Sequence, residues 1–391
     1  MIKSLHVQNF RSLRDLRLDL DRRNVLVGPN MSGKSNIIDL FKFLAQMVLP
    51  RPGVFGVPAA FNARNGFPEV MWKGGEPGII SISVQGDVPE RLTSGAYTDW
   101  IYKLSVLGNV HGLITIQEER LTVSGPKGEA ELIERVEGKR VLKNADGRVL
   151  SHIAEDRSAL EFEIPDWEGT AIRVYFLLFR FYSLIPPLMR QANPASAASF
   201  LNEHGENLSS WLMTLQTNYP DSFSRVRNAA KDVFPDILEL FTSPTQQATV
   251  YAGTMEKYLR RPIQVWQMSD GELTFIALLS LLFAPNTLAG SLYCVEEPEN
   301  HLHPKLLETL IALHDQVRRE LGPDAGQVIL TTHSPQLVDL CRLDELIVVE
   351  RREGSTFCTR PRDKGHLKGL LAREEIGLGN LFFSGALSGA E

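Results

Sequence analysis

The stretch that decides the fold reads Gly28-Pro29-Asn30-Met31-Ser32-Gly33-Lys34-Ser35. It follows a short apolar run, Asn24-Val-Leu-Val27, and it precedes residues 34–48, whose apolar side chains recur at helical spacing and stop before Pro50. A GxxxxGK[ST] loop between a strand and a helix is the context in which this motif binds phosphate. Glycines let backbone N–H groups turn toward a phosphate, and the helix N-terminus favours an anion. A chance match in a turn is the alternative, and the strand and helix context disfavours it.

The residues of this loop are expected to have different roles. Lys34 can reach the β- and γ-phosphates, which places it among the catalytic residues, and the Ser35 hydroxyl can ligate Mg²⁺. The predicted nucleotide contacts of this region are Asn30, Met31, Ser32, Gly33, Lys34, Ser35 and Asn36.

Around the loop, the N-terminal part of the chain has the pattern of β-structure. Residues 1–28 alternate in short strand-like runs, and residues 79–164 show short strands separated by turn signals. We therefore expect an antiparallel β lobe over 79–164, preceded by a long loop over 51–77, which is rich in Gly, Pro and Asn. Residues 170–183 fit a helix or a strand equally well.

A proline pair, Pro186-Pro187, marks the next boundary, and residues 190–262 read mostly helical, with Leu208, Leu212 and Leu215 at helical spacing. An α/β pattern then returns. It predicts helices over 271–284, 304–319 and 335–341, and strands over 291–296, 327–331 and 345–350. The predicted fold class is α/β, with a mixed sheet, an antiparallel β lobe and an inserted helical segment. The predicted domains are 1–185, 186–262 and 263–391.

Two adjacent carboxylates, Glu296 and Glu297, follow the apolar strand that ends at Val295. At a strand end beside a phosphate loop, one carboxylate can hold Mg²⁺ and the next can orient or deprotonate a water. A solvated acidic loop is the alternative. The predicted ligands are ATP and Mg²⁺, with Ser35 and Glu296 on the metal and Glu297 as the base.

Two further elements fit the same site. His333 follows the strand that begins at Gln327, where it could donate a hydrogen bond to a γ-phosphate or a bound water. Ser269-Asp270-Gly271-Glu272 opens a strongly apolar helix and offers a hydroxyl and N–H groups to a phosphate. Taken alone, His333 would be a structural residue and Ser269 a plain helix N-cap.

The phosphate loop, the turn at 269–272, the carboxylate pair at 296–297 and His333 follow one another along the chain. In this order they resemble the motifs of the ABC-type ATPases of the RecF/SMC branch. More closely, they resemble the stand-alone AAA-family ATPases related to the overcoming-lysogenization-defect (OLD) family. Further stretches that carry the resemblance are Asn9-Phe-Arg-Ser-Leu13, Phe200-Leu-Asn-Glu-His-Gly-Glu-Asn-Leu208, Val295-Glu-Glu-Pro-Glu-Asn-His-Leu-His-Pro304 and Gly377-Leu-Gly-Asn-Leu-Phe-Phe-Ser-Gly-Ala386. The resemblance extends over nearly the whole chain and is weakest over 50–165. It implies an ABC-type P-loop ATPase in which 1–185 and 263–391 are two halves of one ATPase domain.

The resemblance also implies roles for individual residues. They are Ser269, Asp270, Gly271 and Glu272 as the signature that binds the γ-phosphate of the opposite subunit, Glu296 as the Walker B carboxylate, Glu297 as the catalytic glutamate, His333 as the switch histidine, Asn300 to Pro304 as the D-loop, and Arg11 near the nucleotide. Because one chain carries one P-loop and one signature, we expect a homodimer, or a larger assembly, with ATP sandwiched between subunits.

Three features depart from the ABC pattern. Walker B ends in Glu296 rather than Asp, Asp270 stands where transporters usually have Gly, and no Q-loop glutamine can be placed, since Gln85 falls in a predicted β-lobe strand. A metal cluster of Glu299, His301 and His303 is an alternative interpretation, which the D-loop match disfavours.

Composition narrows the setting. Of 391 residues, 43% are hydrophobic and 23% charged, the range of soluble globular proteins. Three cysteines without metal-ligand spacing, no leader-like start and no membrane-length apolar run predict a cytoplasmic protein. The net charge of −6 means that DNA binding would need a local basic patch, for which Arg225, Arg227, Lys231, Arg260 and Arg261 are candidates.

Relatives with an attached Toprim nuclease need a full domain after the switch histidine, and here 58 residues follow His333. We therefore expect an ATPase without its own nuclease. The resemblance to the stand-alone relatives implies that it controls or scaffolds a separate effector, a Toprim-like nuclease or a toxin, in bacterial anti-phage defence. The alternatives are a RecF-like repair ATPase that binds DNA directly, an ABC transporter subunit, and a non-hydrolysing switch. The insertion at 190–262 argues against transport, and Glu297 with His333 argues against a switch that does not hydrolyse ATP.

Overall fold

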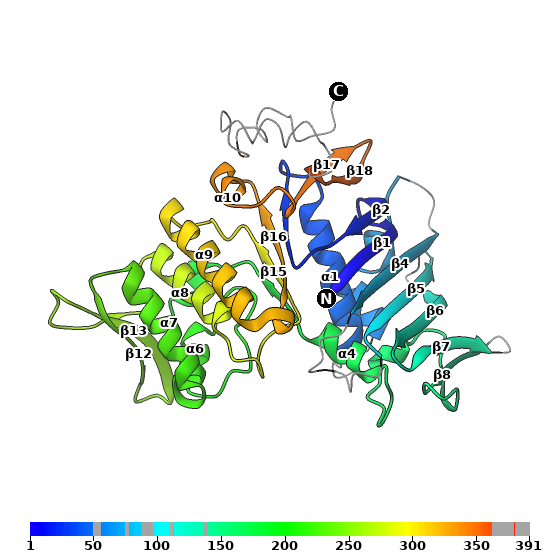
Figure 1. The fold of residues 1–391 in the computed structure, drawn as a ribbon, viewed down its shortest axis with the longest axis horizontal. Coiled ribbons are helices and arrows are strands. Elements are labelled where there is room, and N and C mark those ends of the chain that lie inside the picture. The colour runs from blue at the N-terminus through cyan, green and yellow to red at the C-terminus, as the bar shows by residue number, and fades with distance from the viewer. Residues whose placement is uncertain are drawn as a thin grey trace.

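Two β-sheets face each other across helix α1 (Lys34–Val48), as Figure 1 shows. The computed structural model describes residues 1–49, 56–74, 78–87, 92, 97–109, 111, 113–136, 139–361 and 379. The larger sheet is antiparallel and has eight strands in the order β2-β1-β4-β5-β6-β7-β8-β9. Its strands are β1 (Ile2–Phe10), β2 (Leu13–Asp19), β4 (Ile79–Asp87), β5 (Asp99–Gly108), β6 (Ile114–Gly125), β7 (Gly128–Val136), β8 (Lys139–Lys143) and β9 (Val149–Ile153).

The second sheet carries the predicted nucleotide-binding motifs. Its order is β10-β15-β16-β3-β17-β18, and every neighbouring pair is parallel except β17 with β18. The strands are β3 (Arg23–Val27), β10 (Phe179–Tyr182), β15 (Leu292–Glu296), β16 (Gln327–Thr332), β17 (Leu346–Arg352) and β18 (Ser355–Thr359). Because β3, β15 and β16 are parallel neighbours, the loops after them meet at one edge of the sheet. The mixed α/β fold predicted from the sequence is confirmed.

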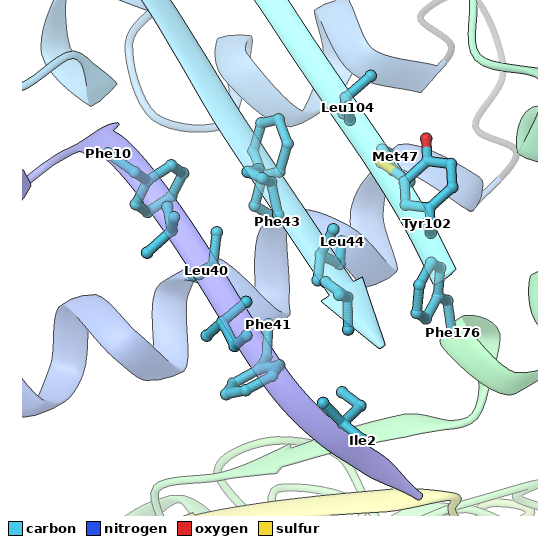
Figure 2. Packing of buried hydrophobic residues seen from close by; sticks show 14 of the residues in the cluster. Ile2, Phe10, Leu40, Phe41, Phe43, Leu44, Met47, Tyr102, Leu104 and Phe176 are labelled. Carbon is cyan, nitrogen blue, oxygen red and sulfur yellow. The ribbon is translucent and has the colours of Figure 1, made fainter. Parts of the chain in front are cut away.

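The two faces of this sheet serve two cores. Cys294, Ile329 and Leu26 face the cluster built around α1, whereas Val295 and Leu330, one residue further along, face the other cluster. This period of two is the pleat of a strand that is buried on both faces. Figure 2 shows the first core, in which side chains of α1, β1, β5 and α4 (Thr170–Leu177) interdigitate. It includes Ile2, Phe10, Leu40, Phe41, Phe43, Leu44, Met47, Tyr102, Leu104 and Phe176.

The second core lies under α8 (Asp270–Leu282) and α9 (Pro304–Leu321). Both helices begin at loops that carry predicted site residues, so their burial fixes those loops against the sheet. The remaining short helices are α2 (Gly56–Asn62), α3 (Phe67–Val70), α5 (Pro186–Met189) and α10 (Pro335–Asp339), with 3₁₀ turns at Ala159–Glu161 and Gly322–Asp324.

The expectation that residues 190–262 are mostly helical is wrong for their second half. Helices α6 (Leu208–Asn218) and α7 (Pro220–Val233) are followed by the antiparallel strands β12 (Ile237–Pro244) and β13 (Thr249–Glu256). The two strands pair around a turn at Thr245–Thr249, and this cross-strand pairing outweighs local helix propensity. Short strands β11 (Asn193–Pro194) and β14 (Ile263–Gln264) complete the sheet. The boundaries 186 and 262 stay a prediction.

Elsewhere the element predictions have mixed outcomes. The strands of 1–28 and the elements after 266 are confirmed, with shifts of up to two residues at their ends. The β lobe is also confirmed, although its last strand ends at Ile153 rather than near residue 164. The long loop expected over 51–77 is wrong where α2 and α3 form, and the undecided stretch 170–183 holds both a helix and a strand. The stretch 377–386 lies outside the described residues except for Gly379. Within the described part of the chain, no helix combines the length and apolarity needed to cross a membrane.

Candidate nucleotide site

The glycines of the phosphate loop are required by close backbone packing. Gly33 has φ +109°, and a Cβ there would lie 2.0 Å from Thr356 Oγ1. A Cβ on Gly28 would lie 2.1 Å from the carbonyl oxygen of Val349. The backbone of the loop is thus pressed against β17 and β18, an approach that a Cβ at either glycine would block.

A hydroxyl network ties the loop to two distant segments. Thr356 Oγ1 donates to the Ser32 carbonyl at 3.0 Å and lies 2.6 Å from Ser12 Oγ, which accepts from Asn36 Nδ2 at 2.6 Å. Asn36, a predicted nucleotide contact, therefore bonds to Ser12 in this structure. Ser32 Oγ is buried and has no protein partner, as expected of a hydroxyl kept for a ligand.

Lys34 lies folded over the loop. Its Nζ donates to the carbonyl oxygens of Gly28 at 2.8 Å and Pro29 at 3.0 Å. Burial lowers the pKa of Lys34 to about 8, against an opposing effect of Glu297 and Glu299. The ammonium therefore sits where a phosphate would replace two carbonyl partners, and a phosphate would raise its pKa again.

The two predicted metal ligands are already in contact. Ser35 Oγ donates to Glu296 Oε2 at 3.1 Å, so the tip of β15 reaches the start of α1. A hydroxyl and a carboxylate are oxygen donors of the kind Mg²⁺ takes, alongside water and substrate phosphates. This donor pair fits the ion, and Ser35 and Glu296 are the residues that would hold it.

The predicted base and switch histidine are also in contact. His333 Nε2 lies 3.2 Å from Glu297 Oε1, and Asn300 Nδ2 donates to Glu297 Oε2 at 3.0 Å. Glu297 has φ +47°, a conformation held by hydrogen bonds from its N–H to Thr331. Backbone strain at a non-glycine residue persists only where the surroundings enforce it, and it concentrates at functional sites.

Glu299 has a positioning role that the sequence did not reveal. Its Oε1 accepts from Thr332 Oγ1 at 2.5 Å and from the His333 N–H at 3.1 Å, which ties the loop after β15 to the loop after β16. The alternative metal cluster is not assembled, because His303 Nδ1 caps α9 at Lys305 N and His301 faces Asp270. Among the described residues, no group of three His, Cys, Asp or Glu side chains has a metal-binding arrangement.

The predicted signature forms the N-terminus of α8. Ser269 Oγ accepts from the Glu272 N–H at 3.2 Å, and the Glu272 carboxylate accepts from the Ser269 N–H at 2.8 Å. Asp270 is fixed by Arg190 Nη2 at 2.5 Å and lies 3.4 Å from His301 Nδ1. Within the described residues, no hydrogen bond or ion pair joins the signature to the phosphate loop of the same chain.

The remaining candidates lie around this centre. Met31 is 81% exposed, with φ +64°, and points into solvent. Arg11 Nε lies 2.5 Å from Asp39 Oδ2, one turn beyond Ser35 on α1, so it braces the helix. Among the described residues, no hydrogen bond or ion pair joins Arg11 to the phosphate loop. Gln85 lies in β4 and accepts a long hydrogen bond from Ser4, so it is not a Q-loop glutamine.

A polar hollow of about 570 Å³, open to solvent, adjoins the two carboxylates. Ser183 and Leu184, directly after β10, line it together with Glu296 and Glu297. Two of the basic residues considered for DNA are already paired on the surface, Arg225 with Glu320 at 2.6 Å and Arg227 with Glu239 at 3.0 Å.

Two family models match this chain. Residues 1–61 match a model described as "AAA ATPase domain", and residues 150–339 match one described as "AAA domain, putative AbiEii toxin, Type IV TA system". The two matched segments contain the phosphate loop, the predicted signature, Glu296, Glu297 and His333. No curated protein matches the chain.

Solved structures share the fold at low sequence identity. One is an Smc head bound to the C-terminal winged-helix domain of ScpA, with a TM-score of 0.54, 12% identity, and coverage of 92% of this chain and 97% of the other. Another is an Smc head with an extended coiled coil bound to the C-terminal domain of ScpA, derived from Pyrococcus furiosus, with a TM-score of 0.55, 11% identity, and coverage of 96% and 99%. The chain therefore shares its fold with the Smc heads, and two of its segments are similar to AAA ATPase domain models.

Proposed function

We propose that this AAA-type domain binds and hydrolyses ATP with Mg²⁺, as a dimer that controls a separate effector protein. The observation that carries the proposal is the pair of contacts Ser35–Glu296 and Glu297–His333, which bring the ends of β3, β15 and β16 together at one edge of the sheet. The phosphate loop, the metal ligands and the base therefore lie next to one another, as phosphoryl transfer requires.

In this mechanism each residue has a separate task. The N–H groups of the loop and Lys34 hold the phosphates, while Ser35 and Glu296 hold Mg²⁺, which neutralises charge on the phosphate oxygens when it is bound. Glu297 orients a water and accepts its proton, and His333, 3.2 Å from Glu297, would donate a hydrogen bond toward the transferred phosphoryl group. Because the Glu297 carboxylate is held by Asn300 and His333, it is already oriented before water binds.

We propose that the signature acts on the partner chain's nucleotide. Ser269 is exposed at the start of α8, Arg190 and His301 hold Asp270, and no bond links this turn to its own phosphate loop within the described residues. A rigid, exposed helix N-terminus suits a γ-phosphate brought by a second copy.

Mixing two inactive variants tests this arrangement. Lys34→Ala removes the phosphate lysine, and Ser269→Arg blocks the signature. A mixed dimer has one site with both defects and one with neither, so ATPase activity should return on mixing to a substantial fraction of wild type. If the mixture stays as inactive as the separate variants while each variant is folded, the trans arrangement is wrong.

The defence role is supported by the AbiEii description of the matched family and by the resemblance to the OLD-related ATPases. The related Smc heads were solved with a bound ScpA domain, so a surface for a separate protein is consistent with this fold. We propose a nuclease-like or toxin-like effector as the partner.

A phage challenge tests this role. Cells that carry the gene with its neighbouring genes should lower phage plating by orders of magnitude, and the Lys34→Ala, Ser269→Arg double variant should abolish the effect. Equal plating with the wild type and the double variant would remove the defence role. DNA-stimulated ATP hydrolysis at low salt would instead favour the RecF-like alternative, because phosphate contacts are strongest there.

A further inference from the structure

We propose that Lys42 and Glu203 form a charge relay that reports occupation of the metal site to the loop 200–207. This inference rests on the proposed function, because it requires Mg²⁺ and ATP to bind beside Glu296. It assigns a role to Phe200–Leu208, one of the stretches that carry the family resemblance.

Lys42 stands between two carboxylates. Its Nζ lies 2.5 Å from Glu203 Oε1 and 3.7 Å from Glu296 Oε1, and it also lies over the ring of Phe181 at 5.7 Å. The Lys42 side chain is only 22% exposed, so its interaction with Glu296 is weakly screened. Lys42 is therefore a built-in counter-charge for Glu296 while Ser35 occupies the other carboxylate oxygen.

A divalent ion on Glu296 competes with this ammonium. Two cations within a few ångströms of one carboxylate repel each other, so Mg²⁺ drives Lys42 toward its second partner. Glu203 is placed to accept that charge, because it already makes the shorter of the two contacts. Binding of the metal ion to Glu296 thus strengthens the ion pair between Lys42 and Glu203.

The loop that carries Glu203 is coupled to the rest of the site. The Ser183 N–H donates to the Glu203 carbonyl at 2.9 Å, the Ile185 N–H donates to the His204 carbonyl at 3.2 Å, and His204 Nδ1 contacts the Ser183 carbonyl at 2.9 Å. Ser183 lines the hollow beside Glu296 and Glu297, and Asn207, which ends the loop, precedes α6. The relay therefore joins the metal site to helix α6 of the segment 186–262.

The test measures the Mg²⁺ concentration that half-saturates binding of a fluorescent ATP analogue to the full chain. Lys42→Met removes the competing cation and should lower this concentration about threefold or more. Glu203→Gln removes the alternative partner, leaves Lys42 on Glu296, and should raise it by a similar factor. The double variant should behave like Lys42→Met, because Glu203 then has no ammonium to hold. Lys73→Met, in an exposed pair with Glu69 at 2.6 Å, is the matched control and should shift nothing.

Hydrogen exchange supplies a readout that does not depend on hydrolysis. Mg²⁺ with the ATP analogue should slow exchange at Ser183 and Ile185 in the wild type and leave it unchanged in Lys42→Met. The relay would be wrong if both single variants shifted the half-saturating Mg²⁺ concentration in the same direction. It would also be wrong if the double variant showed the sum of the two single shifts. Wild-type protein that binds no nucleotide would overturn the proposed function as well. If Lys42→Met does not fold, Lys42→Gln keeps a polar tip and replaces it.

Discussion

His333 Nε2 and Glu297 Oε1, from the ends of two neighbouring parallel strands, lie 3.2 Å apart. This contact joins the predicted base to the residue predicted to sense the γ-phosphate. Glu299 holds the two strand ends together, because it accepts hydrogen bonds from Thr332 and from the His333 N–H.

Glu297→Gln tests the base. The amide keeps the size of the side chain and removes its ability to accept a proton, so hydrolysis should slow by about 100-fold or more. ATP binding should persist, and the ATP-bound dimer should accumulate in size-exclusion chromatography with light scattering. Glu308→Gln on α9 is the control, because that carboxylate is exposed and outside the site. Phosphate release at the wild-type rate in Glu297→Gln would show that another group is the base.

The pKa of Lys34, lowered by burial to about 8, predicts pH-dependent binding. The protonated form binds phosphate, so affinity should be constant below pH 8 and fall above it, by up to about tenfold per pH unit. Titration of nucleotide without Mg²⁺ between pH 7 and 9.5 measures the effect. Lys34→Arg should show no such fall, since arginine stays charged throughout. A wild-type affinity that is flat to pH 9.5 contradicts the lowered pKa.

Two glycines with similar φ angles allow the cost of backbone strain to be measured separately from the cost of a steric clash. Gly33 has φ +109° and would place a Cβ 2.0 Å from Thr356 Oγ1, whereas Gly128 has φ +103° and nothing within 4 Å of a Cβ. Gly128→Ala should cost about 1–2 kcal/mol of unfolding free energy from the backbone alone. Gly33→Ala adds the collision and should cost about 2–4 kcal/mol and abolish nucleotide binding. Equal melting shifts for the two variants would show that Thr356 yields without cost.

Arg190→Met tests the brace behind the signature. The guanidinium bonds to Asp270 Oδ1 and to the Met268 carbonyl, so its loss should loosen the start of α8. The ATP-dependent dimer should weaken about tenfold, or about 1.4 kcal/mol, with nucleotide binding by the monomer retained. Arg225→Met, which breaks an exposed pair with Glu320, should leave dimerisation unchanged. An unchanged dimer in Arg190→Met would remove Arg190 from this role.

The sequence predicted those parts of the site that depend on local order. The phosphate loop, Glu296, Glu297 and His333 each follow a buried strand, and strand ends of one parallel sheet must meet. What it could not predict are contacts between segments far apart in the chain, such as Lys42 with Glu203, Arg190 with Asp270, and Thr356 with Ser32. No periodicity marks these pairs, because each depends on how separate elements pack.

The failed element prediction has a similar cause. The leucines of α6 gave residues 190–262 a helical pattern, and the prediction extended it past Pro235, which lies between the end of α7 and the start of β12. The strands β12 and β13 are identified by their antiparallel pairing with each other and by the turn at Thr245–Thr249 that joins them. Pairing is a tertiary contact, so it overrides a weak local preference.

The central place of β3 has a consequence for biosynthesis. Its partners β16 and β17 lie about 300 residues later in the chain, and Thr356, which braces the phosphate loop, follows them. At about 5–20 residues per second, a ribosome takes roughly 15–60 seconds to supply these strands after β3 has been made. Until then the N-terminal 61 residues, although they match an ATPase model, have no sheet to hold their loop. A chain that ends before Thr356 therefore lacks the strands and the hydroxyl that hold the loop, so the candidate site can form only after translation has passed Thr356.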